Sequence, residues 1–249
     1  MQMSREISFK YKAPLKFQDQ FITASGEVRA TVEFKTFDTL WFNTGTLCNL
    51  KCSNCYIESS PLNDSLVYIS VDEVSNYLDE LDELQVGPPQ IAFTGGEPFM
   101  NPDFLEILDE CLSRDFRILV LTNAMKPMQH KKTELKQLKD RYPSSELVLR
   151  VSIDHYDQSV HEAERGPKSW RPMIDGINWL RDNKFTIKIA GRSLAKETPE
   201  KCRMGYGRLF QELELQLNPD DPDDLVIFPE MDPLTDVPEI TEKCWNILS

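Results

Sequence analysis

The sequence contains no long hydrophobic segment. None of its 249 residues falls in an uninterrupted apolar run of about 18, the length that a membrane-spanning helix requires. The first residues, Met1–Arg5, carry no apolar core of a signal peptide. These two absences argue against a secreted or membrane-embedded protein, and we predict a cytoplasmic one.

Basic residues are in the minority. The chain has 28 lysines and arginines against 41 aspartates and glutamates, which gives a net charge of -13 at pH 7. An average surface of this sign repels the phosphate backbone of nucleic acids. A nucleic-acid partner is therefore not expected unless a local basic patch overrides the average.

Cysteine is scarce and unevenly distributed. Three of the six cysteines, Cys48, Cys52 and Cys55, lie close together, and the other three are too scattered for a second four-cysteine site. In a chain of this length the pattern indicates metal ligation in a reducing compartment rather than a disulfide framework. Clustered thiolates bind a soft metal or an iron–sulfur cluster. Three ligands are one short of the four that structural zinc or a fully protein-ligated cluster takes, so one position is open to a substrate or cosubstrate.

From residue 39 onward, short apolar runs alternate with amphipathic segments. Ser70 and Glu73 form a capping box before the first helical pattern, and Asn101-Pro102 opens the second. Six apolar runs with five intervening helices predict an α/β fold with a parallel sheet. The runs are Leu40–Phe42, Ile91–Phe93, Ile118–Leu121, Leu147–Ile153, Phe185–Ala190 and Val226–Phe228.

The two ends of the chain differ from this core pattern. Residues 6–11 and 28–34 alternate between apolar and polar side chains, as half-buried strands do. We therefore predict a short N-terminal β-extension over residues 1–38 and a core over 39–230. The sequence stops at Ile247–Ser249 in what resembles the opening of a final helix, so the segment 231–249 either ends a minimal core or begins a truncated extension.

Polar residues follow several of the predicted strands. Thr94–Pro98 contains two adjacent glycines, which let a backbone approach a ligand closely, although the same sequence also suits an ordinary strand-to-helix turn. The third strand ends at Asn123. On the fourth, Arg150, Ser152 and Asp154 alternate with apolar residues, so one face of the strand is polar. A polar inner face suits a ligand cavity better than a packed core.

The spacing Cys48-x3-Cys52-x2-Cys55, together with Gly-Gly-Glu-Pro at 95–98, resembles the signature of the radical S-adenosylmethionine (radical SAM) enzymes. The resemblance implies a partial (β/α)6 TIM-like barrel whose reactive groups lie at the carboxyl ends of the strands. It implies that the three cysteines hold a [4Fe–4S] cluster whose open iron binds SAM. A flavodoxin- or ferredoxin-type one-electron donor would reduce the cluster. The 5′-deoxyadenosyl radical released from SAM would then abstract hydrogen from a peptide or small-molecule substrate.

The same resemblance implies SAM contacts at the strand ends. The Gly-Gly backbone and the neighbouring glutamate would hold the SAM amino group, and hydroxyl and carboxylate groups of the fourth strand would hold the ribose. No residue is identified as the catalytic donor of a second hydrogen atom. The expected cofactor-binding residues are Tyr56, Gly95, Gly96, Glu97, Asn123, Ser152, Asp154 and Arg192.

Three cations share the polar faces of the fourth and fifth predicted strands. Arg150, Lys188 and Arg192 would lie in or at the mouth of one cavity, and buried charge demands a partner. The partner is the SAM carboxylate, an acidic substrate or an internal acid such as Asp154. A lysine–aspartate pair that closes a strand end is the alternative.

Two other classes of protein stay open at this point. The three cysteines and a distant fourth ligand could form a structural zinc or redox-sensing module. The fold and the SAM site could also serve a non-catalytic accessory protein.

Overall fold

The computed structural model describes residues 15–84, 89–193, 197–229 and 236–244. The chain divides into two compact units, Thr36–Met231 and a smaller one that combines Met1–Lys35 with Asp232–Ser249. No helix within these described ranges is long and apolar enough to cross a membrane.

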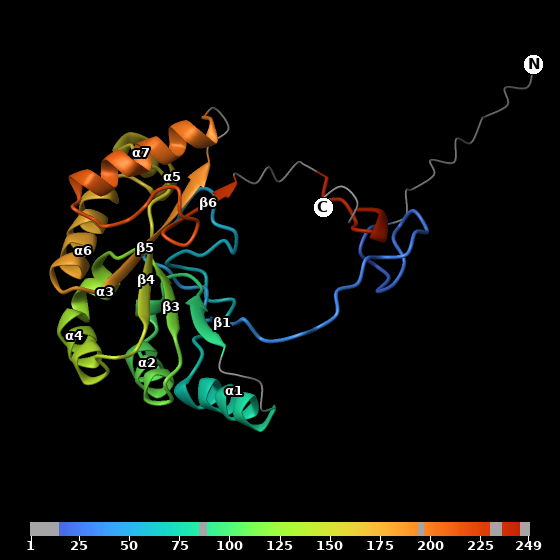
Figure 1. Cartoon of the computed structure of the whole chain (residues 1–249), viewed down its shortest axis with the longest axis horizontal. Helices are drawn as coiled ribbons and strands as arrows, with labels where there is room; N and C mark the ends of the chain where they lie inside the picture. Colours follow the sequence, from blue (N-terminus) through green and yellow to red (C-terminus); the bar gives the residue numbers. More distant parts are fainter. Residues whose placement is uncertain (1–14, 85–88, 194–196, 230–235, 245–249) are drawn as a thin grey trace, which may run out of the picture. The chain divides into compact units, whose positions relative to one another are not determined.

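The larger unit is built on a sheet of six parallel strands in the order β1-β2-β3-β4-β5-β6. The sheet curls into a half-barrel with helices along its outer side (Figure 1). This architecture confirms the predicted partial (β/α)6 barrel. The strands are β1 (Thr39–Asn43), β2 (Gln90–Thr94), β3 (Ile118–Thr122), β4 (Leu147–Ser152), β5 (Thr186–Ser193) and β6 (Leu225–Pro229).

Seven α-helices of the larger unit connect the strands within the described residues. They are α1 (Val71–Leu84), α2 (Phe104–Ser113), α3 (Lys126–His130), α4 (Lys132–Arg141), α5 (Gln158–Arg165), α6 (Trp170–Asp182) and α7 (Pro199–Glu212).

The predicted capping box is formed at the start of α1. Ser70 N donates to Glu73 Oε2 at 2.8 Å, and Glu73 N donates to Ser70 Oγ at 3.3 Å. The second predicted helix start is wrong by a few residues, because α2 begins only at Phe104. Asn101 Oδ1 accepts from Asp103 N at 2.9 Å, and this hydrogen bond holds the intervening residues in a turn.

The side chains of the strands divide between two faces of the sheet. On β4, Leu149 and Val151 belong to the main core that packs beneath the helices. Val148 faces the other way and joins Ala92 and Leu119 in a small apolar cluster inside the half-barrel. These three residues form one layer, because Ala92 pairs in register with Leu119 and Leu119 with Val148. The inner face is therefore apolar near the amino ends of the strands.

Tyr206 ties α7 to the end of β4. Its ring is fully buried, and its hydroxyl donates to Ile153 O at 2.7 Å. Tyr206→Phe leaves that buried carbonyl without this donor, so we expect the free energy of unfolding to fall by about 1–3 kcal/mol. Urea unfolding measures the change, with Tyr77→Phe at a half-exposed ring as the control. Equal midpoints for the two variants would contradict the prediction.

The described residues of the smaller unit, 15–35 and 236–244, contain little regular structure. The strand predicted over 28–34 is wrong: Val28 bridges Ile22, Arg29 bridges Thr241, and no longer strand forms in that segment. Glu239 organises the unit instead, because it accepts from two main-chain amides and pairs with Arg29. The strand predicted over 6–11 and the end of the segment 231–249 lie outside the described residues.

Candidate functional site

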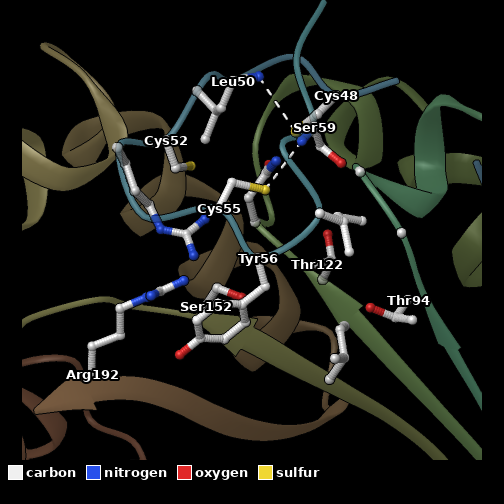
Figure 2. Close-up of a pocket in the computed structure, with 16 residues that line it drawn as sticks. Cys48, Leu50, Cys52, Cys55, Tyr56, Ser59, Thr94, Thr122, Ser152 and Arg192 are labelled. Atoms are coloured by element: carbon white, nitrogen blue, oxygen red, sulfur yellow. Dashed lines mark hydrogen bonds between the residues drawn. The ribbon is translucent and has the colours of Figure 1, made fainter. Parts of the chain in front are cut away.

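A cavity of about 210 Å³ lies at the carboxyl ends of the strands (Figure 2). Its walls come from the loop after β1, from the ends of β2, β3, β4 and β5, and from α5. Nine of the eleven residues that the sequence predicts for the site line this cavity. They are Cys48, Cys52, Cys55, Tyr56, Gly95, Gly96, Asn123, Ser152 and Arg192.

The loop that carries the cysteines is anchored on the end of β2. Gly96 N donates to Gly45 O at 2.8 Å, and Glu97 N donates to Leu47 O at 3.1 Å. A Cβ atom at Gly96 would lie only 2.1 Å from Leu47 O, so glycine is needed for the two backbones to approach. The sequence left open whether the glycine pair lets a ligand approach or forms a strand-to-helix turn. The structure shows that Gly96 also makes room for the cysteine loop.

The far side of the cysteine loop is fixed to α5. Ser53 Oγ and Asn54 Nδ2 each donate to Glu164 Oε2 at 2.8 Å, and Ser53 N donates to Glu164 O at 2.9 Å. In the part of the chain that the structure describes, no three His, Cys, Asp or Glu side chains gather closely enough for a single metal ion.

Two of the three sulfurs accept main-chain hydrogen bonds. Leu50 N donates to Cys48 Sγ at 3.4 Å, and Ser59 N donates to Cys55 Sγ at 3.2 Å. Burial raises the pKa of Cys48 to about 12 and also raises the pKa of Cys52. The thiols lose their protons when a cation binds, since a metal deprotonates its thiol ligands. Three thiols on the wall of one cavity fit the donor set of an iron–sulfur cluster.

Glu97 does not line the cavity. Its side chain is 1% exposed and turns toward the end of β3, where it accepts from Thr122 Oγ1 at 2.7 Å and from Asn123 N at 2.8 Å. It also accepts from Phe99 N at 3.3 Å. Burial raises the pKa of Glu97 to about 7, although these hydrogen bonds oppose the rise. The observed contacts therefore give Glu97 the task of holding Thr122 and Asn123 at the cavity wall.

Glu97→Gln is expected to lower the free energy of unfolding by about 1–3 kcal/mol, because the new amide NH2 would face the N–H of Asn123. The raised pKa sets the pH dependence. The folded protein holds the Glu97 proton more tightly than the unfolded chain does. The stability that protonated Glu97 adds to the wild type is therefore full below pH 4.5 and is lost as the pH rises through about 7. The difference between wild type and variant should therefore shrink over that range. Denaturant unfolding at several pH values measures it, and a difference that widens would contradict the assignment.

Asp154, the second predicted residue outside the cavity lining, lies just behind the wall. It is 3% exposed and forms a bidentate pair with Arg165, whose Nε and Nη2 each lie 2.9 Å from a carboxylate oxygen. Arg192 Nε lies 3.5 Å from Asp154 Oδ1. Burial alone would raise the pKa of Asp154, but Arg165, together with Arg192, outweighs burial and holds the pKa below its ordinary value. Asp154 thus orients two arginines that line the cavity.

Tyr56 connects the cysteine loop with β5 and β6. The guanidinium carbon of Arg192 lies 4.5 Å from the centre of its ring, and its hydroxyl donates to Pro229 O at 3.1 Å. The ring also meets Phe228 edge-on at 6.5 Å. The half-exposed Tyr56 therefore lies at the rim of the cavity, next to the side chain of Arg192 (Figure 2).

The three predicted cations do not share one partner. Arg192 pairs with Asp154, whereas Arg150 and Lys188 both approach Asp223 on the loop before β6. Asp223 is itself 69% exposed. Its pair with Lys188 matches the alternative of a lysine–aspartate pair, and the pair of Arg192 with Asp154 matches the alternative of an internal acid.

Arg165 is the principal lining residue that the sequence analysis missed. It ends α5, a helix of eight residues that begins after Asp157 and stops at Gly166. The sequence did contain a signal for this helix, namely an N-cap aspartate before it and a glycine after it. The aspartate, Asp157, accepts from Ser159 N and Val160 N. A helix this short leaves few apolar positions, so its periodicity is weak.

The parallel half-barrel and its three-cysteine cavity agree with the family that the chain matches. The model of the Radical SAM superfamily covers residues 42–200, which is more than half of the chain. The protein therefore belongs to the radical SAM superfamily, a family of enzymes.

Individual relatives match only in part. The chain is 32% identical over 144 residues to the antilisterial bacteriocin subtilosin biosynthesis protein AlbA of Bacillus subtilis, which covers 57% of this chain and 30% of AlbA. It is 27% identical over 163 residues to the mycofactocin maturase MftC of Mycobacterium ulcerans, covering 65% and 39%. The chain thus spans about a third of the length of these relatives.

Solved structures support the fold. The crystal structure of Streptococcus suis SuiB bound to S-adenosylmethionine superposes with a TM-score of 0.62 at 15% identity, covering 83% of this chain and 43% of SuiB. The structure of native anSMEcpe with bound AdoMet gives a TM-score of 0.59 at 18% identity, covering 80% and 53%. At such identities the likeness concerns the fold alone.

Proposed function

We propose that this protein is a radical SAM enzyme in which Cys48, Cys52 and Cys55 hold a [4Fe–4S] cluster and SAM binds beside it. When bound and reduced, the cluster supplies the electron that cleaves SAM into methionine and a 5′-deoxyadenosyl radical, which abstracts hydrogen from the substrate. The observation that carries the proposal is the single cavity on which all three cysteines, the strand ends and Arg165 converge.

Arg165 is suited to bind the carboxylate of SAM. Asp154 accepts from its Nε and Nη2, so the third nitrogen, Nη1, is left to donate to a ligand in the cavity that Arg165 lines. A guanidinium recognises a carboxylate through directed, charge-assisted hydrogen bonds. Its pairing with a buried aspartate fixes the direction in which that donor points.

The strand ends offer further groups to SAM. Ser152 presents a hydroxyl at the end of β4, and Gly95 and Gly96 present main-chain atoms at the end of β2. Asn123 lines the cavity and donates through Nδ2 to Asn49 Oδ1 at 2.9 Å, which links β3 to the cysteine loop. We assign Ser152 to the ribose and the glycine backbone to the amino group. Glu97 and Asp154 would not touch SAM themselves but would hold the residues that do.

The proposed reaction requires two partners. An external one-electron donor of flavodoxin or ferredoxin type would reduce the cluster inside the cytoplasm. A peptide is the favoured substrate, because the names of the relatives point to peptide products: AlbA serves the biosynthesis of a bacteriocin, and a SuiB structure holds the precursor peptide SuiA. A small molecule stays the second candidate, since heme synthases are also among the relatives.

Anaerobic reconstitution tests the proposal. The purified chain is loaded with iron and sulfide, reduced with dithionite and incubated with SAM, and 5′-deoxyadenosine is quantified. We expect a broad absorbance near 400 nm, typical of iron–sulfur clusters, and 5′-deoxyadenosine even without substrate. A colourless protein that retains one zinc would favour a structural zinc module. A coloured protein that never forms 5′-deoxyadenosine, with cell extract as a source of substrate, would favour a non-catalytic accessory protein.

A further inference from the structure

The inner face of the half-barrel carries two cations that the proposed function leaves without a task. Arg150 of β4 and Lys188 of β5 are register partners on adjacent strands. Their side chains are only 16% and 15% exposed. Both approach the same carboxylate, that of Asp223, so both side chains leave the sheet on the same face.

That face is the one on which the candidate SAM cavity lies. Ser152, two residues beyond Arg150 on β4, lines the cavity. Leu121, the register partner of Arg150 on β3, lines it as well. The two cations therefore lie on the same face as Leu121 and Ser152, although neither cation lines the cavity itself. A strand rises about 3.3 Å per residue, so Arg150 lies roughly 7 Å along β4 from the proposed ribose contact.

The carboxylate of Asp223 does not satisfy the pair. Its side chain is 69% exposed, and Lys188 binds one of its carboxylate oxygens. Arg150 Nη2 lies 3.6 Å from the other oxygen, Oδ1, and donates to the main-chain oxygen of Asp223 at 3.1 Å. Arg150 Nε is buried and has no hydrogen-bond partner among the residues that the structure describes. The neighbouring Asp224 accepts from Asn218 N at 2.9 Å instead. One solvated carboxylate thus faces two largely buried cations, and an unused donor remains.

We propose that Arg150 and Lys188 bind an oxyanion of the substrate, a carboxylate or a phosphate group, and that Asp223 occupies this place until the substrate displaces it. A planar guanidinium and an ammonium on neighbouring strands suit such a group, and Arg150 Nε supplies the donor that Asp223 leaves unused. The inference rests on the proposed function, because the bound oxyanion would hold the rest of the substrate against the SAM side of the cavity. It narrows the substrate to an acidic peptide or small molecule.

Displacement of Asp223 does not require its loop to unfold. Asp223 N donates to Asp221 Oδ1 at 2.8 Å, and Leu225 N donates to Asp221 O at 3.0 Å. These contacts hold the loop through Asp221 and the main chain. The exposed carboxylate of Asp223 can therefore turn into solvent while the backbone keeps its path into β6.

Anion titrations test the proposal on the full chain. Thermal unfolding is followed while sodium acetate or inorganic phosphate is added at constant ionic strength, first to the purified protein and then to the cluster-loaded protein with saturating SAM. The variants are Lys188→Met and Arg150→Met, which keep the apolar stem, and Asp223→Asn. Lys136→Met is the matched control, because Lys136 is exposed on α4 and also pairs with an aspartate, Asp140.

We expect an anion-dependent rise of the melting temperature in wild type and in Lys136→Met. Lys188→Met and Arg150→Met should weaken the apparent anion affinity about tenfold or more, since each removes a charge-assisted hydrogen bond. Asp223→Asn should melt lower than wild type without anion and gain more from it, with an affinity about tenfold tighter. A lower melting temperature without anion combined with a larger rise when anion is added is what displacement of an internal carboxylate predicts.

Several results would overturn the proposal. The first is an anion-dependent rise of the melting temperature that Lys188→Met and Arg150→Met leave unchanged. The second is an Asp223→Asn variant whose melting temperature rises no more than that of wild type. The third is an anion-dependent rise that saturating SAM alone removes. The last would mean that the pair binds SAM itself. Formation of 5′-deoxyadenosine without substrate is measured on the same samples and reports on the proposed function separately. A protein that cleaves SAM but shows no anion effect thus fails only the present inference.

Discussion

Cys52→Ala is expected to lose nearly all cluster-bound iron and to lower 5′-deoxyadenosine formation by more than about 100-fold. Changes that only touch the partners of a metal ligand cost about 10–100-fold in affinity or activity, so removal of a ligand should exceed that range. Cys52 lines the cavity with Cys48 and Cys55, and none of the other cysteines in the described part of the chain lines it. Iron and sulfide content, the absorbance near 400 nm and the rate of SAM cleavage are measured after reconstitution.

Cys111→Ala is the matched control for this experiment. Cys111 is a fully buried residue of α2 and does not line the cavity. Its replacement removes one buried sulfur and should cost about 1 kcal/mol of stability, with cluster content unchanged. If Cys52→Ala kept its iron, or if Cys111→Ala lost as much iron as Cys52→Ala, the assignment of the cluster ligands would be wrong.

Arg165→Leu is expected to lower the free energy of unfolding by about 3–5 kcal/mol, because it leaves a buried carboxylate without its main partner. Asp154 is 3% exposed, and its remaining cation, Arg192, lies 3.5 Å away. Without Arg165 the pKa of Asp154 should rise, because burial raises it and Arg165 is the largest opposing influence. The destabilisation should therefore be largest near neutral pH and should diminish in acid, where Asp154 takes up a proton. Guanidinium unfolding at pH 5 and pH 7.5 measures both effects.

Two further variants separate the pairing of Arg165 from its proposed contact with SAM. Arg141→Leu breaks an ion pair with Asp109 in which the arginine is 58% exposed, and should cost less than about 1 kcal/mol. Arg165→Lys keeps the charge and loses the bidentate geometry, so we expect intermediate stability and weaker SAM binding by calorimetry. A loss for Arg165→Leu no larger than that for Arg141→Leu would refute the importance of the buried pair.

The sequence predicted the barrel well because buried parallel strands appear as short apolar runs. All six predicted runs overlap the strands β1–β6. The failures have local causes. Asn101 caps a turn rather than α2, and α3 and α5 are too short for a clear helical period. Residues 28–34 alternate like a strand but find only single bridging partners.

The site was predictable where its signal is local. The cysteine spacing and the glycine pair lie in continuous stretches of sequence, and all five residues line the cavity. The partners of Glu97 and Asp154 come from β3 and α5. No pattern within a single segment specifies which way a buried carboxylate turns, because its direction depends on the donors that tertiary packing brings near it. The sequence therefore identified Glu97 and Asp154 as polar residues at the strand ends, but it did not predict that both lie behind the cavity wall.

The anchoring of the cysteine loop makes the cavity sensitive to a position that bears no side chain. Gly96 and Glu97 hold the loop through main-chain hydrogen bonds to Gly45 and Leu47, and none of these bonds uses a sulfur atom. A side chain at position 96 would place its Cβ only 2.1 Å from Leu47 O and would have to push the loop away from the end of β2. The places of the three cysteines on the cavity wall therefore depend on a residue that offers no sulfur, charge or hydroxyl of its own.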